Sequence, residues 1–340
     1  MFNCFYIYKY KLLSNLNEIK KQNPHSKICA MVKANAYGLG INQIVRLLDN
    51  RVDFFGVSNY AEAKVVRRLT QNKILIVSAL ERKKILDESF SYACHSIEDV
   101  EYLISLNKPF KIHLKINTGM NRFGFANLTE FKSTLELIKA SRLILEGVFT
   151  HFATTDKFVE VQFERFFTYV NLVKKFGFKP IVHADNSFVN LTHNHGFDMV
   201  RIGFSLYNFA EQNFCPVAEI FSTVLQLNDI KSGDLVGYDR RFIASRPMRV
   251  AVLSLGYADG FDMHLIGFNL NVKGVDCRVL NVCMDCIMLD VSNMKIKKGD
   301  KVAILNNDNS LKKYAKYLNT TEYEVMTKFS FIRSKRIVKN

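Results

Sequence analysis

Short apolar runs alternate with segments of helical spacing through the first two thirds of the chain. Runs of this length, bounded by glycine or small polar residues, are typical of buried parallel strands. Between them, positions such as Ile41, Ile44 and Leu48 follow the spacing of an amphipathic helix, and residues 10–22 predict the first helix. The predicted strands are residues 28–34, 53–58, 73–79, 91–96, 111–117, 143–151, 180–187 and 199–204.

This alternation predicts a parallel sheet, because right-handed crossovers join each strand to the next through a helix. Eight such units favour a closed (β/α)8 TIM-like barrel over an open sheet. After about residue 217 the strand period dominates, with glycine and aspartate at the breaks. We therefore expect an α/β barrel over residues 1–217 and an all-β, strand-rich C-terminal domain over residues 218–340. The strands expected there are residues 221–227, 234–238, 248–256, 270–275, 278–291 and 301–305.

The composition is that of a soluble globular protein, since 48% of the 340 residues are hydrophobic and 23% are charged. No apolar run reaches membrane-spanning length, and the first residues lack the features of a signal peptide. Seven scattered cysteines favour reduced thiols and a cytoplasmic location. Cys283 and Cys286 have CxxC spacing, but no second pair accompanies them, so we expect no metal site.

The net charge of +15 raises the alternative of nucleic-acid or membrane binding. The lysines are spread over many segments, however, and no zinc-finger spacing, RNP-type motif or basic arm is present. A solvated basic surface that favours an anionic ligand is the better interpretation. We expect neither nucleic acid nor a membrane as a partner.

Lys33 is the most informative polar residue, because it ends an apolar run and precedes a turn that contains Tyr37 and Gly38. A lysine in apolar surroundings loses its proton more easily and becomes a nucleophile able to form a Schiff base. The alternative is a lysine that ends a strand and extends its amine to water.

Other polar residues also fall at predicted strand ends, where the active sites of such barrels lie. One histidine there would more often be structural, but several basic groups on one rim indicate a site. The Gly203–Phe204 turn could offer backbone N–H groups to a phosphate. A barrel enzyme that holds pyridoxal phosphate through Lys33 fits this set. The residues are Lys33, Lys115, Asn117, Arg122, His151, His183, Ser187, Arg201 and Gly203.

Several motifs also resemble those of the alanine racemase family, which are fold-type III pyridoxal phosphate enzymes. The resemblance covers nearly the whole chain, and the motifs occur in the family's order. It implies interconversion of L-alanine and D-alanine, the latter for peptidoglycan. The matching segments are residues 31–38, 115–124, 150–153, 183–187, 200–207, 256–260 and 283–285.

The resemblance implies two catalytic bases. Lys33 would hold the cofactor and accept the proton of D-alanine, whereas Tyr257 would act on L-alanine from the opposite face. A single base would tend to return the proton to the side from which it came. A free tyrosine titrates near a pH of about 10, so the resemblance places His151 between Tyr257 and Arg201 to assist it.

The remaining roles are also implied by the resemblance. Arg201 would donate to the pyridine nitrogen, with His183 supporting it. Arg122 would contact the cofactor's phenolic oxygen and the substrate carboxylate, which the Met284 backbone N–H would also bind. Lys115 is expected to be carbamylated. Tyr37, Ser187, Gly203 and Phe204 would hold the phosphate, and Asn186 is a further cofactor-binding candidate.

In the family, Tyr257 and Met284 enter the partner subunit's site, so a homodimer with shared active sites is expected. The chain departs from the family near its end, where Phe331 is the nearest analogue of a phosphate-contacting tyrosine. A missing hydroxyl there would weaken phosphate binding by roughly 1 kcal/mol.

Two other interpretations of the same motifs stay open. One is a different activity of the same fold type, either a broad-specificity racemase (for example for serine) or a decarboxylase. Decarboxylases place a carboxylate against the ring nitrogen, so Arg201 argues against them. The other is a non-catalytic pyridoxal phosphate-binding protein, against which the strand-rich domain and Tyr257 argue.

Overall fold

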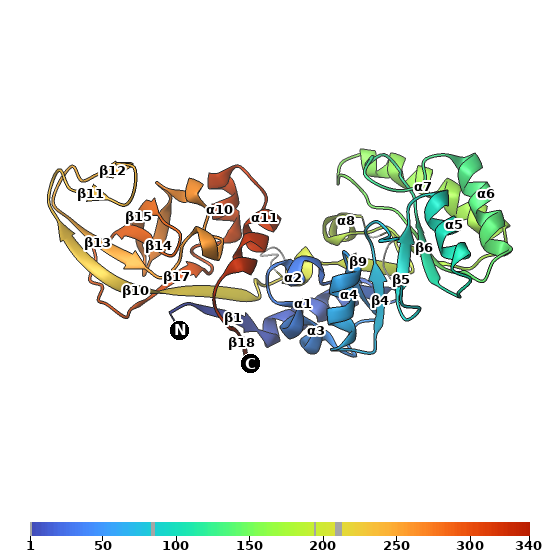
Figure 1. The fold of residues 1–340 in the computed structure, drawn as a ribbon, viewed down its shortest axis with the longest axis horizontal. Coiled ribbons are helices and arrows are strands. Elements are labelled where there is room, and N and C mark those ends of the chain that lie inside the picture. Colours follow the sequence, from blue (N-terminus) through green and yellow to red (C-terminus); the bar gives the residue numbers. More distant parts are fainter. Residues whose placement is uncertain (1, 83–85, 194, 208–212) are drawn as a thin grey trace. The chain divides into compact units, whose positions relative to one another are not determined.

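The computed structural model describes residues 2–82, 86–193, 195–207 and 213–340, and Figure 1 traces them. The chain divides into two compact units. The barrel unit consists of Leu13–Ala36 and Ile44–Phe214. The strand-rich unit consists of Met1–Leu12, Tyr37–Gln43 and Cys215–Asn340.

All ladders of the barrel sheet are parallel, which confirms the predicted (β/α)8 architecture. The sheet order is β8-β7-β6-β5-β4-β3-β2-β9. The barrel is nearly closed: between β8 and β9, the Arg201 N–H donates to the Asp185 carbonyl at 3.2 Å. The strands are β2 (Lys27–Met31), β3 (Phe54–Val57), β4 (Lys73–Ile76), β5 (Ser91–Cys94), β6 (Lys111–Lys115), β7 (Ile144–Phe149), β8 (Ile181–His183) and β9 (Met199–Ile202).

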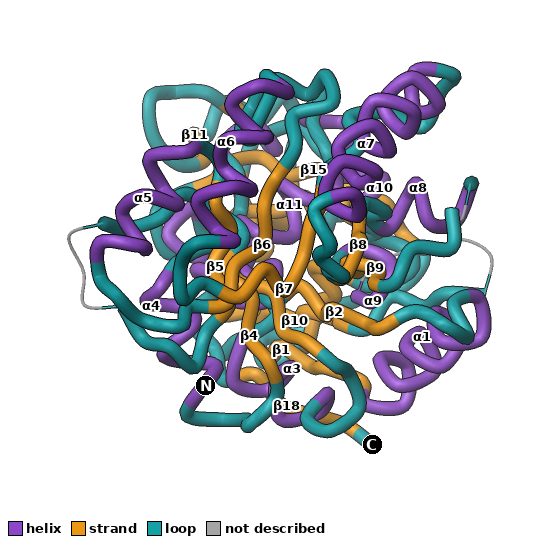
Figure 2. Tube along the Cα trace, turned by 90° about the vertical axis from the view of Figure 1, so that its right-hand side faces the viewer, coloured by secondary structure: helices purple, strands orange, loops and turns teal. Residues whose placement is uncertain are grey.

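Helices surround the barrel strands, as Figure 2 shows for α4 to α7. Their apolar stripes face inward; on α6, for example, Phe131, Leu135 and Ile138 are buried. The first helix begins at Lys9, one residue before the predicted start. The helices are α1 (Lys9–Gln22), α2 (Lys33–Tyr37), α3 (Ile41–Leu48), α4 (Tyr60–Arg67), α5 (Ile97–Ser105), α6 (Leu128–Lys139), α7 (Phe158–Lys175), α8 (Ser187–Thr192) and α9 (Phe204–Tyr207).

The interior of the barrel carries polar side chains where branched aliphatic residues usually pack. His113 on β6 and His183 on β8 are fully buried, and their nitrogens lie 2.8 Å apart. Gly147 on β7 makes room for them, because a Cβ at this position would lie 2.0 Å from His113 Nδ1. This glycine is therefore required by close packing.

The strand-rich unit contains one large, mainly antiparallel sheet with the order β14-β15-β16-β13-β10-β1-β18, and β17 also pairs with β10. The long strand β10 carries much of the pairing (Figure 1). A small second sheet joins β11 and β12. The strands are β1 (Cys4–Tyr8), β10 (Ala218–Ile230), β11 (Leu235–Val236), β12 (Phe242–Ile243), β13 (Met248–Leu253), β14 (Asn269–Val272), β15 (Val275–Val282), β16 (Ile287–Asp290), β17 (Lys301–Leu305) and β18 (Arg336–Lys339).

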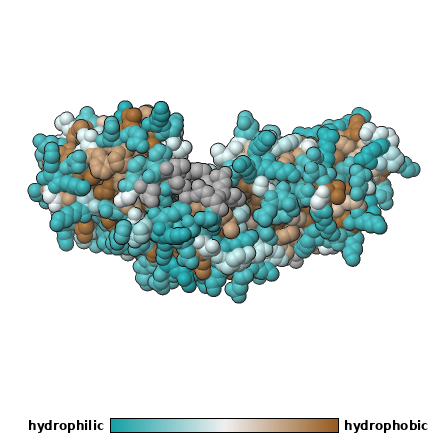
Figure 3. Space-filling model, turned by 180° about the vertical axis from the view of Figure 1, so that it is seen from behind, coloured by the Kyte–Doolittle hydropathy of each residue, from teal (hydrophilic) through white to brown (hydrophobic). Residues whose placement is uncertain are grey.

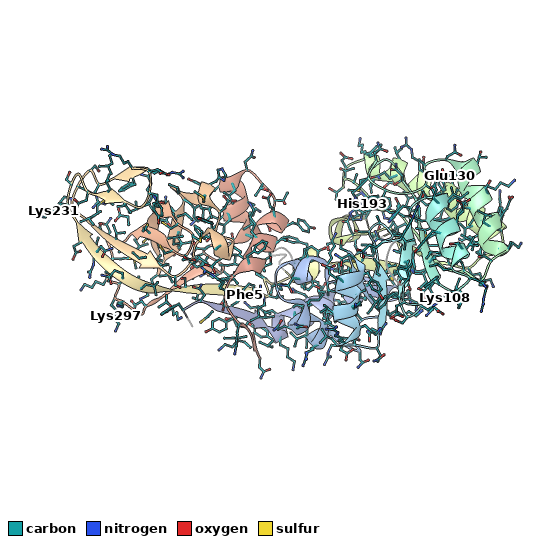
Figure 4. The ribbon with its side chains drawn as sticks, in the orientation of Figure 1. Phe5, Lys108, Glu130, His193, Lys231 and Lys297 are labelled. Atoms are coloured by element: carbon teal, nitrogen blue, oxygen red, sulfur yellow. The ribbon has the colours of Figure 1, made fainter. Side chains whose placement is uncertain are left out.

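The first twelve residues group with the strand-rich unit, whereas the sequence pattern assigned them to the barrel domain. Strand β1 pairs with β10 and with β18 near the chain's other end, and Phe5 on β1 is fully buried there (Figure 4). Five residues give no period that distinguishes a strand of one sheet from a strand of another. Their assignment therefore depends on pairing partners more than 200 residues away.

Two further features of this unit differ from the sequence pattern. Residues 278–291, expected as one strand, form parts of two paired strands, β15 and β16, with a turn between them. Two short helices, α10 (Leu311–Leu318) and α11 (Glu322–Lys328), were not expected. The buried residues of α10, Leu311, Tyr314 and Ala315, do follow the helical spacing i, i+3, i+4, so for this helix the signal was present in the sequence. Single-turn 3-10 helices complete the unit: η1 (Tyr257–Asp259), η2 (Met263–Leu265) and η3 (Phe329–Phe331).

The visible face in Figure 3 is largely hydrophilic, with apolar residues scattered over it. Basic residues such as Lys231 and Lys297 are exposed in the strand-rich unit (Figure 4). Among the described residues, no helix has both the length and the apolar character that crossing a membrane requires.

The close packing at Gly147 yields a stability prediction. Gly147→Ala should lower the free energy of unfolding by about 1–3 kcal/mol, because the new methyl group overlaps the His113 ring. Urea denaturation measures this change. In a His113→Ala background the obstructing ring is gone, so the same substitution should cost less than about 1 kcal/mol. An equal cost in both backgrounds would contradict the packing argument.

Candidate active site

Lys33 stands directly after the carboxyl end of β2, at the start of an unusual turn. The four residues that follow, Ala34 to Tyr37, all have φ between 51° and 55°, which is left-handed helical backbone. Such backbone costs roughly 1–2 kcal/mol per non-glycine residue, so tertiary contacts must stabilise it. The Glu62 carboxylate supplies one, accepting from the Ala34 N–H at 2.7 Å and the Ser58 N–H at 2.8 Å.

The surroundings of Lys33 favour its neutral amine. Burial is the main factor that lowers its pKa, and the charges of Arg122 and Arg201 lower it further, while Glu62 acts in the opposite direction. An amine with a depressed pKa is a better nucleophile at neutral pH. The structure therefore gives Lys33 the property that the sequence analysis required of it.

Lys115 is a second buried amine on the same rim, at the end of β6. It is 5% exposed and forms no ion pair within the described part of the chain. Its Nζ lies over the rings of Phe123 and Phe149, 5.3 and 5.9 Å from their centroids. Burial, followed by the charges of Arg122, Arg201 and Lys33, lowers the pKa of Lys115 to about 8. Lys115 therefore loses its proton far more easily than an ordinary lysine.

Arg201 on β9 is buried, and carbonyl and imidazole acceptors surround its guanidinium. Nη2 donates to the carbonyls of Thr150 and Ala184 at 2.7 and 2.8 Å, and Nη1 lies 2.6 Å from His183 Nδ1. The guanidinium also lies over the Phe149 ring, 5.2 Å from its centroid. Burial lowers the pKa of Arg201 to about 10, so it stays protonated at neutral pH.

His151 and His183 are both neutral at physiological pH, because burial and the charge of Arg201 hold their pKa values well below the usual range. Since guanidinium has no acceptor, His183 Nδ1 at 2.6 Å must accept from Arg201 Nη1. His151 Nδ1 lies 3.5 Å from Arg201 Nη2, which already donates its two hydrogens to the Thr150 and Ala184 carbonyls at shorter distances.

The turns after β8 and β9 converge in the barrel unit. The Ser187 hydroxyl lies 3.2 Å from the Gly203 N–H and 3.3 Å from the Ser205 N–H. The Ser205 hydroxyl is buried and has no hydrogen-bond partner among the described residues. Asn186 accepts from the Val189 N–H and donates to the Phe152 carbonyl, both at 3.3 Å. Hydroxyls and amides thus gather where the sequence analysis expected a phosphate, and Ser205 is an addition to that set.

In the strand-rich unit, Tyr257 and Met284 are brought together and are both exposed, at 42% and 54%. The Tyr257 N–H donates to the Cys283 carbonyl at 3.0 Å, and the Ala258 N–H donates to the Met284 carbonyl at 3.1 Å. Gly256 is required by this contact, because a Cβ there would lie 2.2 Å from the Met284 carbonyl oxygen. The CxxC spacing of Cys283 and Cys286 reflects the turn between β15 and β16, where their backbones bond at 2.8 Å.

The turn that carries Tyr257 is anchored by an ion pair between a buried carboxylate, Asp259, and a half-exposed guanidinium, Arg333. Asp259 is fully buried and accepts from Arg333 through its backbone N–H, Nε and Nη2 at 2.8–3.0 Å, and from the Gly256 N–H at 3.1 Å. Burial raises the pKa of Asp259, but these hydrogen bonds more than offset that effect and hold the pKa below its usual range. Asp259 is thus ionised, and it ties η1 to the C-terminal segment.

Tyr37 groups with the strand-rich unit, although the sequence analysis placed it in the barrel domain. Its ring lies 6.1 Å from that of Tyr323 on α11. The next residue, Gly38, has φ 89° and packs against α11, where a Cβ would lie 2.6 Å from the Met326 carbonyl oxygen. Phe331, the analogue of the family's C-terminal tyrosine, is 69% exposed.

Sequence reasoning missed three polar residues of the barrel interior and rim. His95, after β5, is buried. It packs against Phe123, with ring centroids 5.1 Å apart. His113 and Glu146 lie deeper in the barrel and bond to each other at 3.2 Å. A signal for His113 was available in the sequence. It alternates with outward-facing residues along β6, which places its side chain on the face that points into the barrel.

The comparisons with known proteins agree with this geometry. Residues 7–210 match the model of the alanine racemase N-terminal domain, and residues 217–338 match that of the C-terminal domain. The alanine racemase of Staphylococcus carnosus is 32% identical over 342 residues, covering 93% of this chain and 89% of that protein. The alanine racemase of Francisella philomiragia is 31% identical over 354 residues, covering 96% and 97%.

Solved structures show the same two-domain fold. Alanine racemase from Bacillus anthracis with bound L-Ala-P has a TM-score of 0.93 at 26% identity, covering 99% of this chain and 95% of that one. Alanine racemase from Bartonella henselae with covalently bound pyridoxal phosphate has a TM-score of 0.89 at 23% identity, covering 100% of both chains, which shows a common fold. The fold and the matches define an enzyme of the isomerase class. The chain belongs to the alanine racemase family.

The anchoring of Tyr257 yields a second stability prediction. Arg333→Met should lower the free energy of unfolding by about 1–2 kcal/mol at neutral pH, because buried Asp259 loses the donors Nε and Nη2 of a half-exposed guanidinium and keeps only its two backbone N–H donors. Because the pKa of Asp259 is depressed in the folded protein, Asp259 contributes to the free energy of unfolding at pH values above its unfolded-state pKa of about 4. This contribution is lost as the pH falls through the lower folded-state pKa. Urea denaturation at several pH values measures both effects.

A double variant supplies the control for this measurement. Asp259→Asn removes the buried charge, so Arg333→Met should cost clearly less in that background. Additive costs would show that the ion pair does not hold the turn.

Proposed function

We propose that this protein interconverts L-alanine and D-alanine with pyridoxal 5'-phosphate as its cofactor. The observation that supports this most strongly is the cluster of Lys33, Lys115 and Arg201, whose pKa values are all lowered by burial, with the charge of Arg122 adding to the effect on both lysines. Such a cluster suits a doubly anionic cofactor and a substrate carboxylate.

The residues of the barrel unit fit pyridoxal phosphate. Lys33 offers an amine of depressed pKa to the aldehyde. The Ser187 hydroxyl, the Gly203 and Ser205 amides and the unpartnered Ser205 hydroxyl offer donors to the phosphate. The Arg201 hydrogen bonds use Nη1 and Nη2, so Nε is the donor that we assign to the ring nitrogen. Tyr37, Asn186 and Phe204 complete the proposed cofactor contacts.

Two proton carriers are required, one on each face of the substrate. When bound, the cofactor supplies a conjugated system that accepts the electron pair left on the substrate's α-carbon. We assign Lys33 Nζ to the proton of D-alanine and the Tyr257 hydroxyl to that of L-alanine. Arg122 and the Met284 backbone N–H would hold the substrate carboxylate, so that the α-hydrogen stays aligned with both bases.

His151 would assist Tyr257 as a hydrogen-bond donor. We assign its proton to Nε2, because Nδ1 lies on the side of the Arg201 guanidinium, which can only donate. A donor directed at the phenol oxygen stabilises phenolate and lowers the barrier to proton abstraction. A neutral imidazole can donate this hydrogen bond without transferring its own proton to the phenolate.

The active sites would be shared between the subunits of a homodimer. Tyr257 and Met284 lie exposed on the turns of one unit, which suits residues that enter a partner's site. Each subunit would then provide the barrel of one site and the tyrosine of the other. We further propose that the protein works in the cytoplasm and supplies D-alanine for peptidoglycan.

A broad-specificity racemase is the second candidate, because the described residues do not fix the size of the substrate side chain. A panel that includes serine distinguishes the two functions: conversion of alanine at least tenfold faster than serine supports the first, and equal rates the second.

Mixing two inactive variants tests the two-base and shared-site proposals together. Lys33→Ala should lose the visible absorbance of the bound cofactor, whereas Tyr257→Phe should keep it and lose racemisation. After subunit exchange, the mixture should recover about a quarter of wild-type activity, since half of the dimers are mixed and each has one intact site. Absence of recovery, with mixed dimers demonstrated by mass spectrometry, would place both bases in the same subunit.

Carbamylation of Lys115 can be tested separately with carbon-13-labelled bicarbonate. The free amine reacts with carbon dioxide and releases a proton to solvent, and Arg122 and Arg201 would stabilise the resulting anion. Because the pKa of Lys115 is about 8, labelling should increase as the pH rises through that value. A carbamate signal in carbon-13 NMR should appear in the wild type and be absent from Lys115→Met. A signal that persists in the variant would show that the label is elsewhere.

A further inference from the structure

A continuous chain of hydrogen bonds crosses the interior of the barrel below Arg201. Arg201 Nη1 lies 2.6 Å from His183 Nδ1, and His183 Nε2 lies 2.8 Å from His113 Nδ1. His113 Nε2 then lies 3.2 Å from Glu146 Oε2. Four side chains from strands β9, β8, β6 and β7 therefore form one line from the catalytic rim towards the other end of the barrel.

The chemistry of its two ends gives this line a fixed direction. Arginine can only donate, so His183 must accept at Nδ1 and carry its proton on Nε2. That proton is donated to His113 Nδ1, so His113 carries its own proton on Nε2. Glu146, an ionised carboxylate, accepts the last bond. Every member thus has one possible role, and both histidines are held as the Nε2–H tautomer.

Glu146 keeps its charge although it is largely buried. Burial raises its pKa, but hydrogen bonds from His113, Lys73 and Ser91 more than offset this and hold the pKa far below its usual range. Lys73 Nζ donates to Oε1 at 2.7 Å, and the Ser91 hydroxyl donates to Oε2 at 2.5 Å. The two carboxylate oxygens therefore have separate partners: Oε1 faces the lysine, and Oε2 faces Ser91 and His113.

This line of polar side chains is less favourable for stability than aliphatic packing would be, because it buries two imidazole rings and requires a glycine beside them. His113 and His183 are fully buried, and burial lowers the pKa of both, so they stay neutral. A glycine at position 147 is needed to admit the His113 ring. Buried polar networks are stable only when every member is satisfied, and a reversed tautomer would set two N–H groups against each other.

We propose that Glu146 and His113 are positioning residues for Arg201, acting through His183. By fixing His183 as an acceptor, they hold the guanidinium in one orientation, with Nη1 committed to the imidazole and Nε left for the cofactor ring. The role of Arg201 towards the ring rests on the proposed function, whereas the direction of the line rests on the four side chains alone.

The substitution Glu146→Gln tests the direction of the line. Glutamine has a single oxygen, and the half-exposed Lys73 favours it on the Oε1 side, where its ammonium donates in the wild type. The amide NH2 group then faces His113, whose Nε2 must become an acceptor. His113 would shift to the Nδ1–H tautomer, and His183 would follow, presenting an N–H to Arg201. Glu146→Gln combined with Lys73→Met is the matched control, because without the lysine the amide oxygen can turn back towards His113.

Nitrogen-15 NMR of labelled histidines, recorded on the cofactor-free protein at neutral pH, reports the tautomers directly. The wild type should show Nε2–H for both His113 and His183, the single variant should shift both to Nδ1–H, and the double variant should restore Nε2–H. A wild type that already carries Nδ1–H on either ring would overturn the proposal, as would a folded single variant in which both the tautomers and kcat are unchanged.

A second measurement connects the line to the site. Glu146→Gln should lower kcat about tenfold and weaken cofactor binding, and the double variant should recover most of both, as outer-shell partners do at metal sites. A loss of thermal stability without a change in tautomer or kcat would indicate a purely structural role. If the wild type lacks racemase activity, the proposed function fails, and NMR still decides the direction of the line.

Discussion

The buried guanidinium of Arg201 is the constraint around which the barrel unit is arranged. A charge in the barrel interior is tolerated only when its N–H groups have acceptors, because an unpaired buried charge costs several kcal/mol. The carbonyls of Thr150 and Ala184 and the ring of His183 meet this requirement. The ends of β7 and β8 are thereby fixed in relation to β9, and His183 acquires its tautomer from the same source.

The other cations of the rim take their chemistry from this environment. Lys33 and Lys115 lie among positive charges and in apolar surroundings, and both effects favour their neutral amines. The left-handed turn after Lys33 is unfavourable on its own, and Glu62 helps to hold it. Strain and charge repulsion at one place are typical of a site built to bind an anionic ligand. In the strand-rich unit, Tyr257 lies on an exposed turn, and the hydrogen bonds between Asp259 and Arg333 hold this turn in place.

The local pattern predicted most of the fold because each element carries its own signal. The barrel strands are apolar runs flanked by turn residues, and all eight occur where they were expected. Each ends earlier at its carboxyl end than the predicted range. The motifs around Lys33, Arg201 and Tyr257 likewise stand at strand ends or turns. The pattern failed for β1, whose five residues show no distinguishing period, and the helical spacing of α10 was missed in a region dominated by strand-like segments. The grouping of Tyr37 with α11 follows from contacts between distant segments, which no local pattern encodes.

The sequence by itself determined the order of the barrel strands, the lysine after β2 and the set of basic residues on the rim. These follow from composition and period along the chain, which are local properties. Only the tertiary structure decided that His113 and Glu146 continue the contacts of Arg201, that Gly147 admits the His113 ring and that Asp259 pairs with Arg333. Hydrogen bonds between residues 18 to 74 positions apart leave no periodic trace, because they depend on which strands are neighbours and on which face each side chain occupies.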